Sequence, residues 1–566
     1  MLRQKIQNLV RETTAALCGE DKLPENVVIE KPKNNFGDYA VNVAFGLAKK
    51  MGKSAENIAQ ELAEKISADL PPEFEKAEAV GGYVNFFLSP KYLREQLSDI
   101  ASQKNYEKSG SGKGQTVIVE YSQPNIAKKM HVGHLRNTIL GDALANIYEN
   151  QGYKVIRWNY LGDWGTQFGN LIAAYKRWGN EDEVKKNPIE TLMALYLRFT
   201  GEAKSDAELN QIGRDEFKKL EEGDEENLKL WKWFKELSLE EFNKTYRQLD
   251  IKFDVDIGES FYEKGLKTLV AKLKEDGLAE NSEGGVIIKL EKFGLPPALI
   301  QKSDGASLYL TRDIANLEYR LKKYQPVEIL YVVGNEQSLH FQQLLAIAEM
   351  LKLDQAKLKH IKYGLVLGED KKKLATREGR VILAEDLIEK SISLAREIIQ
   401  TKNPDLADKD RVAKDVGIGA LKYEMLKDSR TTDMVFDWKR MLDFTGNSGP
   451  YLQYTYARLN GILEKVGVRT EPDFGQLTEK TELNLIKQLI EFPANLTLSY
   501  QTDNPNHLTL YLHQLANLTN NFYEKIPVLK DENENRRLAR LALVEIIAKV
   551  LGNGLSLLGI RAPRKI

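Results

Sequence analysis

Short apolar runs alternate with longer segments of helical periodicity along much of the chain. Four runs are rich in β-branched and aromatic residues: TVIVEYS at 116–122, KVIRWNYLG at 154–162, EILYVVG at 328–334 and HIKYGLVLG at 360–368. Three of them are bounded by glycine and apolar on both faces, which is typical of buried parallel strands. Because helical stretches separate the runs, the pattern predicts an α/β domain built on a parallel sheet.

The first part of the chain has a different pattern and predicts a small α+β unit over 1–110. Apolar spacing indicates helices at 1–18 and near 54–67, and GGYVNFFLS at 81–89 is typical of a strand. The composition of SGSGKG at 109–114 is that of a flexible linker, which we expect to end this unit.

Two further segments are mainly helical. A stretch rich in Lys, Glu and Trp, at about 171–256, interrupts the apolar runs, and we expect it to form a helical insertion. From about residue 385 the chain is almost wholly helical, which predicts a connector over 385–446 and a bundle over 447–566. The parallel-sheet domain then covers 111–384.

Composition narrows the class of protein. The 566 residues are 42% hydrophobic and 29% charged, as in a soluble globular protein of several domains. Lys and Arg total 81 and Asp and Glu total 82, so the net charge of -1 excludes a histone-like protein but allows local basic patches. The single cysteine, Cys18, excludes a disulfide framework and a multi-cysteine zinc site.

Hydropathy also bears on location. No run approaches the ~18 apolar residues that a membrane span needs. Charged residues are mixed into the first helix, which is typical of a surface helix and not of a signal peptide. We therefore expect a cytoplasmic protein with no membrane partner.

The stretch 116–150 has the most informative chemistry. Its strand leads through a turn at Pro124 into an amphipathic helix, which opens where His131 and His134 bracket Gly133. The N-terminus of a helix after a strand and loop is an anion site, and glycine lets a phosphate approach the backbone. Histidines three apart face the same side of a helical turn, so both imidazoles can donate hydrogen bonds to phosphoryl oxygens.

Two other interpretations of this histidine pair stay open. The side chains could simply be solvated at a helix N-terminus. A metal site is the other alternative, but no third histidine or cysteine lies nearby in the sequence, and we expect no metal ligands.

The same stretch resembles the class I aminoacyl-tRNA synthetases, and among them the arginyl-tRNA synthetases. His131-Val132-Gly133-His134 is similar to the class I HIGH signature, and PNIAKKMHVGHLRNT is similar to the arginyl version. Six more matches are spread in order over the whole chain, one before this stretch and five after it: FGDYAVNVA, NYLGDWGTQFG, SLYLTRDIA, YVVGNEQSLHFQQL, GPYLQYTYAR and LLGIRAP.

The resemblance implies a fold and an activity. The fold class is multidomain α/β: a Rossmann-like parallel-sheet catalytic domain with a helical insertion, an N-terminal α+β domain that contacts tRNA, and a C-terminal all-α anticodon-binding bundle. The activity is that of an arginine–tRNA ligase, which uses ATP with Mg2+ to form arginyl-adenylate and then charges tRNA(Arg). Such an enzyme is expected to act as a monomer, and its activation of L-arginine generally requires bound tRNA.

The resemblance also assigns candidate site residues. His131, His134 and Lys128 are the expected catalytic residues, and with Gly133 they are the expected ATP-binding residues. The expected arginine-binding residues are Glu120, Asn125, Tyr309, Asp313 and Gln337.

Within this set, the resemblance gives Asp313 and Tyr309 to the guanidinium, since a buried carboxylate matches its planar fork. The run SLYLT before Asp313 is interpreted as a strand, and the alternative role of Asp313 is to cap the helix DIANLEYRL. Gln123 stands where the family usually has a small residue.

The second class I signature, Lys-Met-Ser-Lys-Ser, matches DKKKLATREGRVI at 370–382 only in part. Its candidate residues are Lys371, Lys372, Lys373, Thr376 and Arg377. Leu374 and Ala375 stand at the Met-Ser positions, and the second lysine is missing. In similar enzymes a lysine before the first signature compensates, and Lys128 stands there. The alternative is a solvated basic turn.

The segment GPYLQYTYARLNGIL offers two helical faces. On one face, Leu452, Tyr456, Leu459 and Leu463 form a narrow stripe that should pack inward. Tyr451, Tyr454 and Arg458 fall on a separate face that suits stacking on unpaired bases of tRNA, and Tyr523 is expected to join that surface. The alternative is a second packing face within the bundle.

Two other functions remain to be weighed against the ligase. A small-molecule nucleotidyltransferase could share the histidine signature, but it would not need a long helical bundle. A non-catalytic RNA-binding relative could carry the altered second signature, although the intact set of Glu120, Asn125, His131, His134 and Asp313 argues against it.

Overall fold

A computed structural model describes residues 2–19, 27–32, 36–103, 105–106, 108–303, 305–368, 370–372, 382–465 and 471–566. The chain forms two compact units. Unit 1 comprises Met1–Tyr106, Ile462–Phe492 and Asn517–Ile547, and unit 2 comprises Glu107–Gly461, Pro493–Ala516 and Ala548–Ile566.

Unit 1 contains a four-stranded antiparallel sheet in the order β1-β2-β4-β3. Its strands are β1 (Ile29–Glu30), β2 (Tyr39–Val41), β3 (Phe74–Val80) and β4 (Tyr83–Leu88). Its main helices are α1 (Leu2–Cys18), α2 (Val43–Met51), α3 (Ala55–Ala68), α4 (Pro90–Ser102) and α18 (Lys480–Ile490). The predicted helices at 1–18 and 54–67 and the strand at 81–89 are confirmed.

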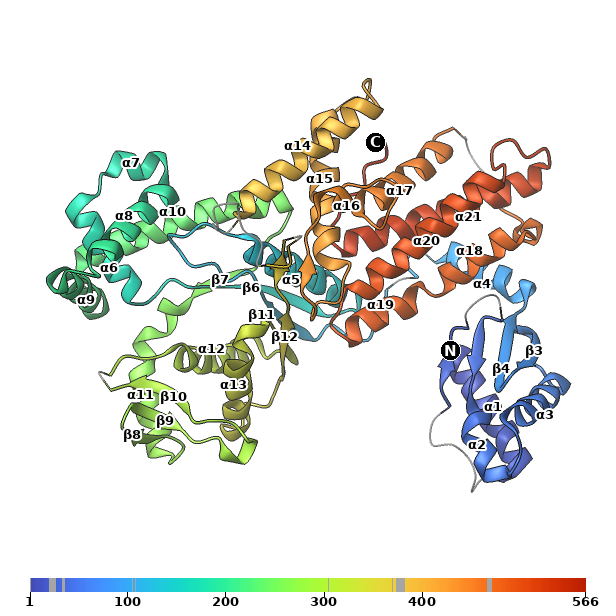
Figure 1. Ribbon diagram of the computed structural model, residues 1–566, viewed down its shortest axis with the longest axis horizontal. Coiled ribbons are helices and arrows are strands. Elements are labelled where there is room, and N and C mark those ends of the chain that lie inside the picture. Colours follow the sequence, from blue (N-terminus) through green and yellow to red (C-terminus); the bar gives the residue numbers. More distant parts are fainter. Residues whose placement is uncertain are drawn as a thin grey trace. The chain divides into compact units, whose positions relative to one another are not determined.

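A five-stranded parallel sheet organises unit 2, in the order β12-β11-β5-β6-β7 (Figure 1). The strands are β5 (Thr116–Glu120), β6 (Lys154–Leu161), β7 (Val255–Gly258), β11 (Glu328–Gly334) and β12 (Lys357–Tyr363). Four of them come from the four apolar runs, so the predicted parallel α/β sheet is confirmed. Strand order reverses beside β5, and in such sheets ligands bind at the carboxyl ends of the strands at this point.

The fourth apolar run is not one strand, as the sequence suggested. β12 ends at Tyr363, and Val366–Leu367 forms a separate strand, β13, which pairs with β14 (Met434–Val435). The break occurs at Gly364, where an added Cβ would lie 2.6 Å from the Thr432 carbonyl. Such a close approach of two backbones ends the ladder and redirects the chain.

Helices cover both faces of the parallel sheet. The helix α5 (Val132–Asn150) contacts β5, β6 and β11 on one face. On the other face Ile118, Trp158 and Ile329 share one buried cluster with residues of α11 (Glu263–Glu275), α12 (Tyr309–Tyr324) and α13 (Ser338–Met350). Because side chains alternate along a strand, Glu120 lies on the same face as Ile118, toward α12.

Five helices lie between β6 and β7, in the part of the sequence predicted to be an insertion. They are α6 (Thr166–Trp178), α7 (Glu181–Lys186), α8 (Pro188–Glu202), α9 (Ala207–Glu222) and α10 (Glu225–Leu249). Figure 1 shows α6 to α9 gathered around one end of the long helix α10. A small antiparallel sheet follows β7 in sequence and was not predicted: β8 (Glu280–Ser282), β9 (Gly285–Ile288) and β10 (Ala298–Lys302).

The predicted strand SLYLT is wrong, because α12 already begins at Tyr309. Leu310, Ile314 and Leu317 recur at helical spacing and are buried, so packing of this face overrides the local strand preference of the run. The N-cap position belongs to Leu308. Asp313 therefore lies inside the second turn and does not cap the helix.

The last part of the chain is helical, as predicted, apart from β14. The helices are α14 (Ala384–Lys402), α15 (Lys409–Leu426), α16 (Trp438–Met441), α17 (Gly449–Leu463), α19 (Phe492–Gln501), α20 (Asn506–Lys525) and α21 (Glu534–Leu557), with α18 in unit 1. Within the described residues, no helix combines the length and apolar character needed to cross a membrane.

The contact of α5 with β5 generates a test of the fold. An added Cβ at Gly141 would lie 2.3 Å from Cβ of the buried Tyr121, too close to the backbone for a rotamer change to relieve. We expect Gly141→Ala to cost about 1–3 kcal/mol in the free energy of unfolding. Gly265→Ala in α11 meets no atom within 4 Å and should instead stabilise by roughly 0.5–1 kcal/mol. Thermal unfolding checks both, and equal shifts of the two variants would contradict the packing argument.

Candidate active site

The two histidines of the first signature form one unit at the start of α5. His131 is the N-cap residue, and its Nδ1 accepts a hydrogen bond from the Gly133 amide at 3.0 Å. His134 Nδ1 accepts from the His131 amide at 3.2 Å, and the ring centroids lie 3.9 Å apart. Because both Nδ1 atoms act as acceptors, we assign the proton of each neutral ring to Nε2. The pair thereby presents N–H donors and no fixed positive charge.

Electrostatics keep His134 uncharged. Burial, together with the nearby His131 and Lys128, lowers its pKa to about 3. A neutral imidazole at a helix N-terminus can donate a hydrogen bond to an anionic oxygen without placing a positive charge in the empty site.

The adjacent lysines differ in their surroundings. Lys129 pairs with Glu190 of α8 at 2.5 Å and lies 4.0 Å from Glu385 at the start of α14. Within the described part of the chain, the Lys128 ammonium has no hydrogen-bond or ion-pair partner. Both lysines line a cleft bounded by α8, α10 and Leu383. Lys128 is thus the member of the doublet that is available to a ligand.

Glu120 ends β5 in a tight internal network. It is 3% exposed, one carboxylate oxygen pairs with Arg320 of α12, and the other accepts from Gln123 Nε2 at 2.6 Å. Burial raises the pKa of Glu120 against the opposing charge of Arg320. The Arg320 guanidinium lies 4.3 Å from the ring centroid of Trp158. Arg320 therefore anchors the Glu120 carboxylate. This ion pair was not predicted from the sequence.

Asp313 lies in the same acidic neighbourhood. Its Oδ2 is 2.6 Å from Nε2 of His340 in α13. Burial disfavours charge on His340, yet the hydrogen bond and charge of Asp313, with Glu120 nearby, raise its pKa above the ordinary value. His340 falls within the quoted motif YVVGNEQSLHFQQL, which was the signal that could have found it.

A third carboxylate, Glu259, was also missed. Burial raises its pKa to about 8; Arg312 opposes this shift, and Asp313 adds to it. Glu120, Asp313 and Glu259 all raise the pKa of the half-buried Tyr160 of β6, so the three acidic groups lie around one place. Such a concentration of carboxylates suits a cationic ligand.

The other predicted ligand-binding residues are placed less tightly. Asn125 bridges to Gly162 beyond β6, where an added Cβ would lie 2.2 Å from the Asn125 side-chain oxygen. Tyr309 is 60% exposed and stands one turn before Asp313 on α12. Gln337 is exposed in the turn Asn335–Gln337 that follows β11. The roles expected for these three side chains stay predictions.

The second signature is described only at its edges. Lys371 and Lys372 lie in a turn in which the Gly368 amide donates to the Lys372 carbonyl at 2.8 Å. Lys373, Thr376 and Arg377 lie outside the described residues. At the end of the signature, the Val132 amide donates to the Ile382 carbonyl at 3.0 Å. The chain that leaves the second signature thus meets the first.

The proposed tRNA face of α17 is partly exposed. Leu452 and Leu459 of the inward stripe are buried, as predicted, but Tyr456 and Leu463 are only half-buried, so the stripe is confirmed in part. Tyr454 is 38% exposed. The Arg458 guanidinium lies 4.9 Å from the Tyr454 ring centroid. The Tyr451 ring is half-buried, 5.7 Å from that of His513. Tyr523 is exposed and belongs to unit 1, so its place on a common surface stays a prediction.

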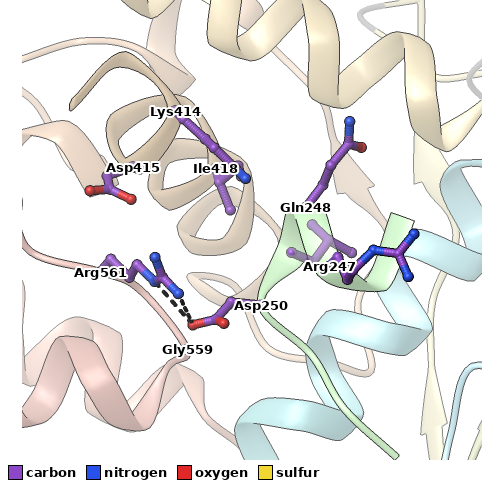
Figure 2. A pocket seen from close by; sticks show the side chains of 9 residues that line it. Arg247, Gln248, Asp250, Lys414, Asp415, Ile418, Gly559 and Arg561 are labelled. Atoms are coloured by element: carbon purple, nitrogen blue, oxygen red, sulfur yellow. Dashed lines mark hydrogen bonds and ion pairs between the residues drawn. The ribbon is translucent and has the colours of Figure 1, made fainter. Parts of the chain in front are cut away.

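A separate pocket shares no residue with the predicted active site (Figure 2). There Arg561, from the motif LLGIRAP, pairs with Asp250 after α10 at 2.8 Å. Figure 2 shows Lys414 of α15 pointing into the space between these elements. The motif that follows α21 therefore ties α10 and α15 together.

No cluster of three or more His, Cys, Asp or Glu side chains with the arrangement of a metal site occurs within the described ranges.

Comparison with known proteins covers the whole chain. Residues 96–438 match the family model of the class I (R) tRNA synthetase catalytic domain, residues 452–566 the DALR anticodon binding domain, and residues 4–88 the arginyl tRNA synthetase N-terminal domain.

Relatives named arginine–tRNA ligase match over nearly their full length. The one from Clostridioides difficile is 43% identical over 100% of this chain and 98% of its own, and that from Clostridium perfringens is 44% identical over 96% of each. Neither the nucleotidyltransferase nor the non-catalytic alternative finds support among these matches.

Solved structures agree with the sequence relatives. The arginyl-tRNA synthetase of Thermus thermophilus superposes with a TM-score of 0.82 at 26% identity and covers 100% of both chains. The Plasmodium falciparum enzyme gives 0.81 at 28% identity, over 100% of this chain and 99% of its own. The chain belongs to the arginyl-tRNA synthetase family of class I aminoacyl-tRNA synthetases.

Proposed function

We propose that this chain joins L-arginine to tRNA(Arg) at the carboxyl edge of the parallel sheet. In the first step an arginine carboxylate oxygen attacks the α-phosphorus of ATP, and the bond to pyrophosphate breaks. In the second step a hydroxyl of the 3′-terminal ribose attacks the arginyl carbonyl, and AMP leaves. The observation that carries the proposal is the histidine pair at the start of α5, whose Nδ1 atoms both accept backbone amides, at the same edge of the sheet as the carboxyl group of Glu120.

No side chain needs to act as a nucleophile in either step. Catalysis then consists of holding the two substrates in line and stabilising the charge that develops on the phosphoryl oxygens. We assign donors to that charge at His131 Nε2, His134 Nε2 and the Lys128 ammonium, while Gly133 keeps the backbone open to the phosphates. Mg2+ would enter with ATP, held mainly through phosphate oxygens.

Arginine would lie with its guanidinium at Asp313 and Tyr309, which share one face of α12. Glu120, Asn125 and Gln337 would hold the amino-acid head and its surroundings, with Arg320 and Gln123 fixing the Glu120 carboxylate. The contrast between carboxylates here and neutral imidazoles at α5 matches one cationic and one anionic substrate.

Unpaired bases of tRNA would stack on Tyr451, Tyr454 and Tyr523, with Arg458 beside them, and the N-terminal domain would contact tRNA as well. A monomeric state and a cytoplasmic location remain predictions.

Charging assays with each of the twenty amino acids on bulk tRNA test the function. We expect ATP-dependent charging with arginine alone. Asp313→Asn should raise the arginine KM strongly, because an unpaired guanidinium costs about 2–5 kcal/mol, roughly a 30-fold change or more. Its KM for ATP should stay near that of the parent. Charging with another amino acid, or an unchanged arginine KM in the variant, would refute the assignment.

The pairing of His340 with Asp313 predicts a pH dependence. The pKa of His340 is raised, so as pH falls through that value the ring gains a proton and neutralises Asp313. Proton and guanidinium then compete, and the arginine KM should rise toward acid pH. Steady-state kinetics over a pH series that spans neutrality measures this. His340→Gln keeps a donor to Asp313 but cannot be protonated, so its KM profile should be flatter.

The two lysines before the first signature should differ in their effect. Lys128→Ala should lower kcat of tRNA-dependent ATP–pyrophosphate exchange by roughly 10²–10³-fold, as for loss of one preorganised donor. The arginine KM should change little, since the interaction strengthens only in the transition state. Lys129→Ala is the control, because its ammonium is already occupied by Glu190, and it should stay near the parent. Equal effects of the two substitutions would contradict the role of Lys128.

A further inference from the structure

Arg136 is a buried arginine on α5, two residues beyond the second histidine of the signature. It is 2% exposed. Its Nη1 donates to the carbonyls of Gly364 and Leu365 at 2.7 and 2.8 Å. Its Nη2 donates to the carbonyls of Arg430 and Thr432 at 3.3 and 3.0 Å. No ion pair joins it to a carboxylate anywhere in the described ranges.

The four carbonyls belong to two segments that are themselves joined. The Gly364 amide donates to the Arg430 carbonyl at 2.9 Å, and the Met434 amide donates to the Leu365 carbonyl at 2.9 Å. The Leu365 amide donates to Asp433 Oδ1 at 2.7 Å. Arg136 thus closes a seam between the chain that enters the second signature and the chain before β14.

The chain that leaves the second signature is held by the same part of the molecule. The Ala384 amide donates to the Met130 carbonyl at 2.9 Å, and Leu383 forms a bridge with His131. Residues 130–136 therefore hold Leu365 before the signature and Ile382 at its end. The same few residues carry both histidines.

The chemistry of the contact requires an arginine. Burial of a guanidinium without a carboxylate is unfavourable and lowers the pKa of Arg136. The planar fork gives Arg136 two N–H groups on each terminal nitrogen, and these reach four carbonyls on two separate segments. A lysine ammonium has only three donors on a single atom, and an apolar side chain has none. The four hydrogen bonds offset the cost of burying the charge only while α5, residues 364–365 and residues 430–432 keep this arrangement.

We propose that Arg136 is a positioning residue for adenylate formation, which rests on the proposed function. It fixes Gly364 and Leu365, at the entry of the second signature, relative to His131 and His134, which are expected to bind the phosphates. It touches neither substrate. Its loss should lower kcat without weakening the binding of the substrate arginine, because the carboxylates proposed to bind arginine lie on β5 and α12.

The test compares Arg136→Lys with Arg157→Lys. Arg157 is the matched control because it also contacts α5, through Glu149 and Asn146 at the opposite end of the helix. For Arg136→Lys we expect kcat of ATP–pyrophosphate exchange to fall about 100-fold, as for a small misplacement of reacting groups. The arginine KM should change less than roughly threefold, as expected when only the transition state is affected. Arg157→Lys should keep the parent kcat.

A second readout does not depend on activity. Trypsin should cut after Lys371 or Lys372 faster in Arg136→Lys than in the parent or in Arg157→Lys, with thermal unfolding recorded for each. Gly364→Ala disrupts the same contact, because its added Cβ would lie 2.6 Å from the Thr432 carbonyl, and it should reproduce the loss of kcat. This variant also tests the proposal if Arg136→Lys does not fold.

Each outcome decides the proposal. An unchanged kcat, a rise in arginine KM equal to the fall in kcat, or the same loss in Arg157→Lys would overturn it. If the parent protein charges tRNA with arginine and the variants do so at the parent rate, the role of Arg136 is wrong and the function stands. If the parent charges no tRNA with arginine, the function itself is wrong, and the trypsin comparison still reports on the seam.

Discussion

The rest of the structure depends on the pairing of β5 with β6 on one side and β11 on the other. Because all three strands run parallel, their loops must leave the sheet at the same edge. The histidine helix follows β5, Asn125 meets Gly162 after β6, and Gln337 follows β11. Groups far apart in the sequence reach one place through hydrogen bonding of the backbone alone.

Opposite electrostatic needs are met side by side at this edge. Burial lowers the pKa of His134 and so favours its neutral form. Burial also favours the neutral form of Glu120, but there the charge of Arg320 opposes the effect. The anionic substrate therefore meets neutral donors first, and positive charge must come from a group such as Lys128, whose ammonium has no partner within the described residues. Carboxyl groups held in place can bind the cationic arginine, whereas a lysine without a partner can move toward the phosphates of ATP. This difference fits a site where arginine stays whole and ATP is cleaved.

Sequence patterns predicted the frame of the molecule better than its polar contacts. The apolar runs of β5, β6 and β11 carry their own signal, since a strand buried on both faces must be continuously apolar. SLYLT misled because its strand preference is local, whereas the burial of Leu310 and Ile314 in α12 is set by distant partners. The pairing of Glu120 with Arg320 joins positions 200 residues apart, and no spacing rule could find it.

The anchoring of Leu365 and Ile382 to the start of α5 makes the stretch between them a closed loop of chain. The entropy of closing such a loop depends only weakly on its length, at about 0.6 kcal/mol for each doubling. Length and composition inside the loop are therefore cheap to change, while the anchors are not. The entropy of loop closure therefore constrains the two anchors far more than the sequence between them, which can vary with the needs of the reaction.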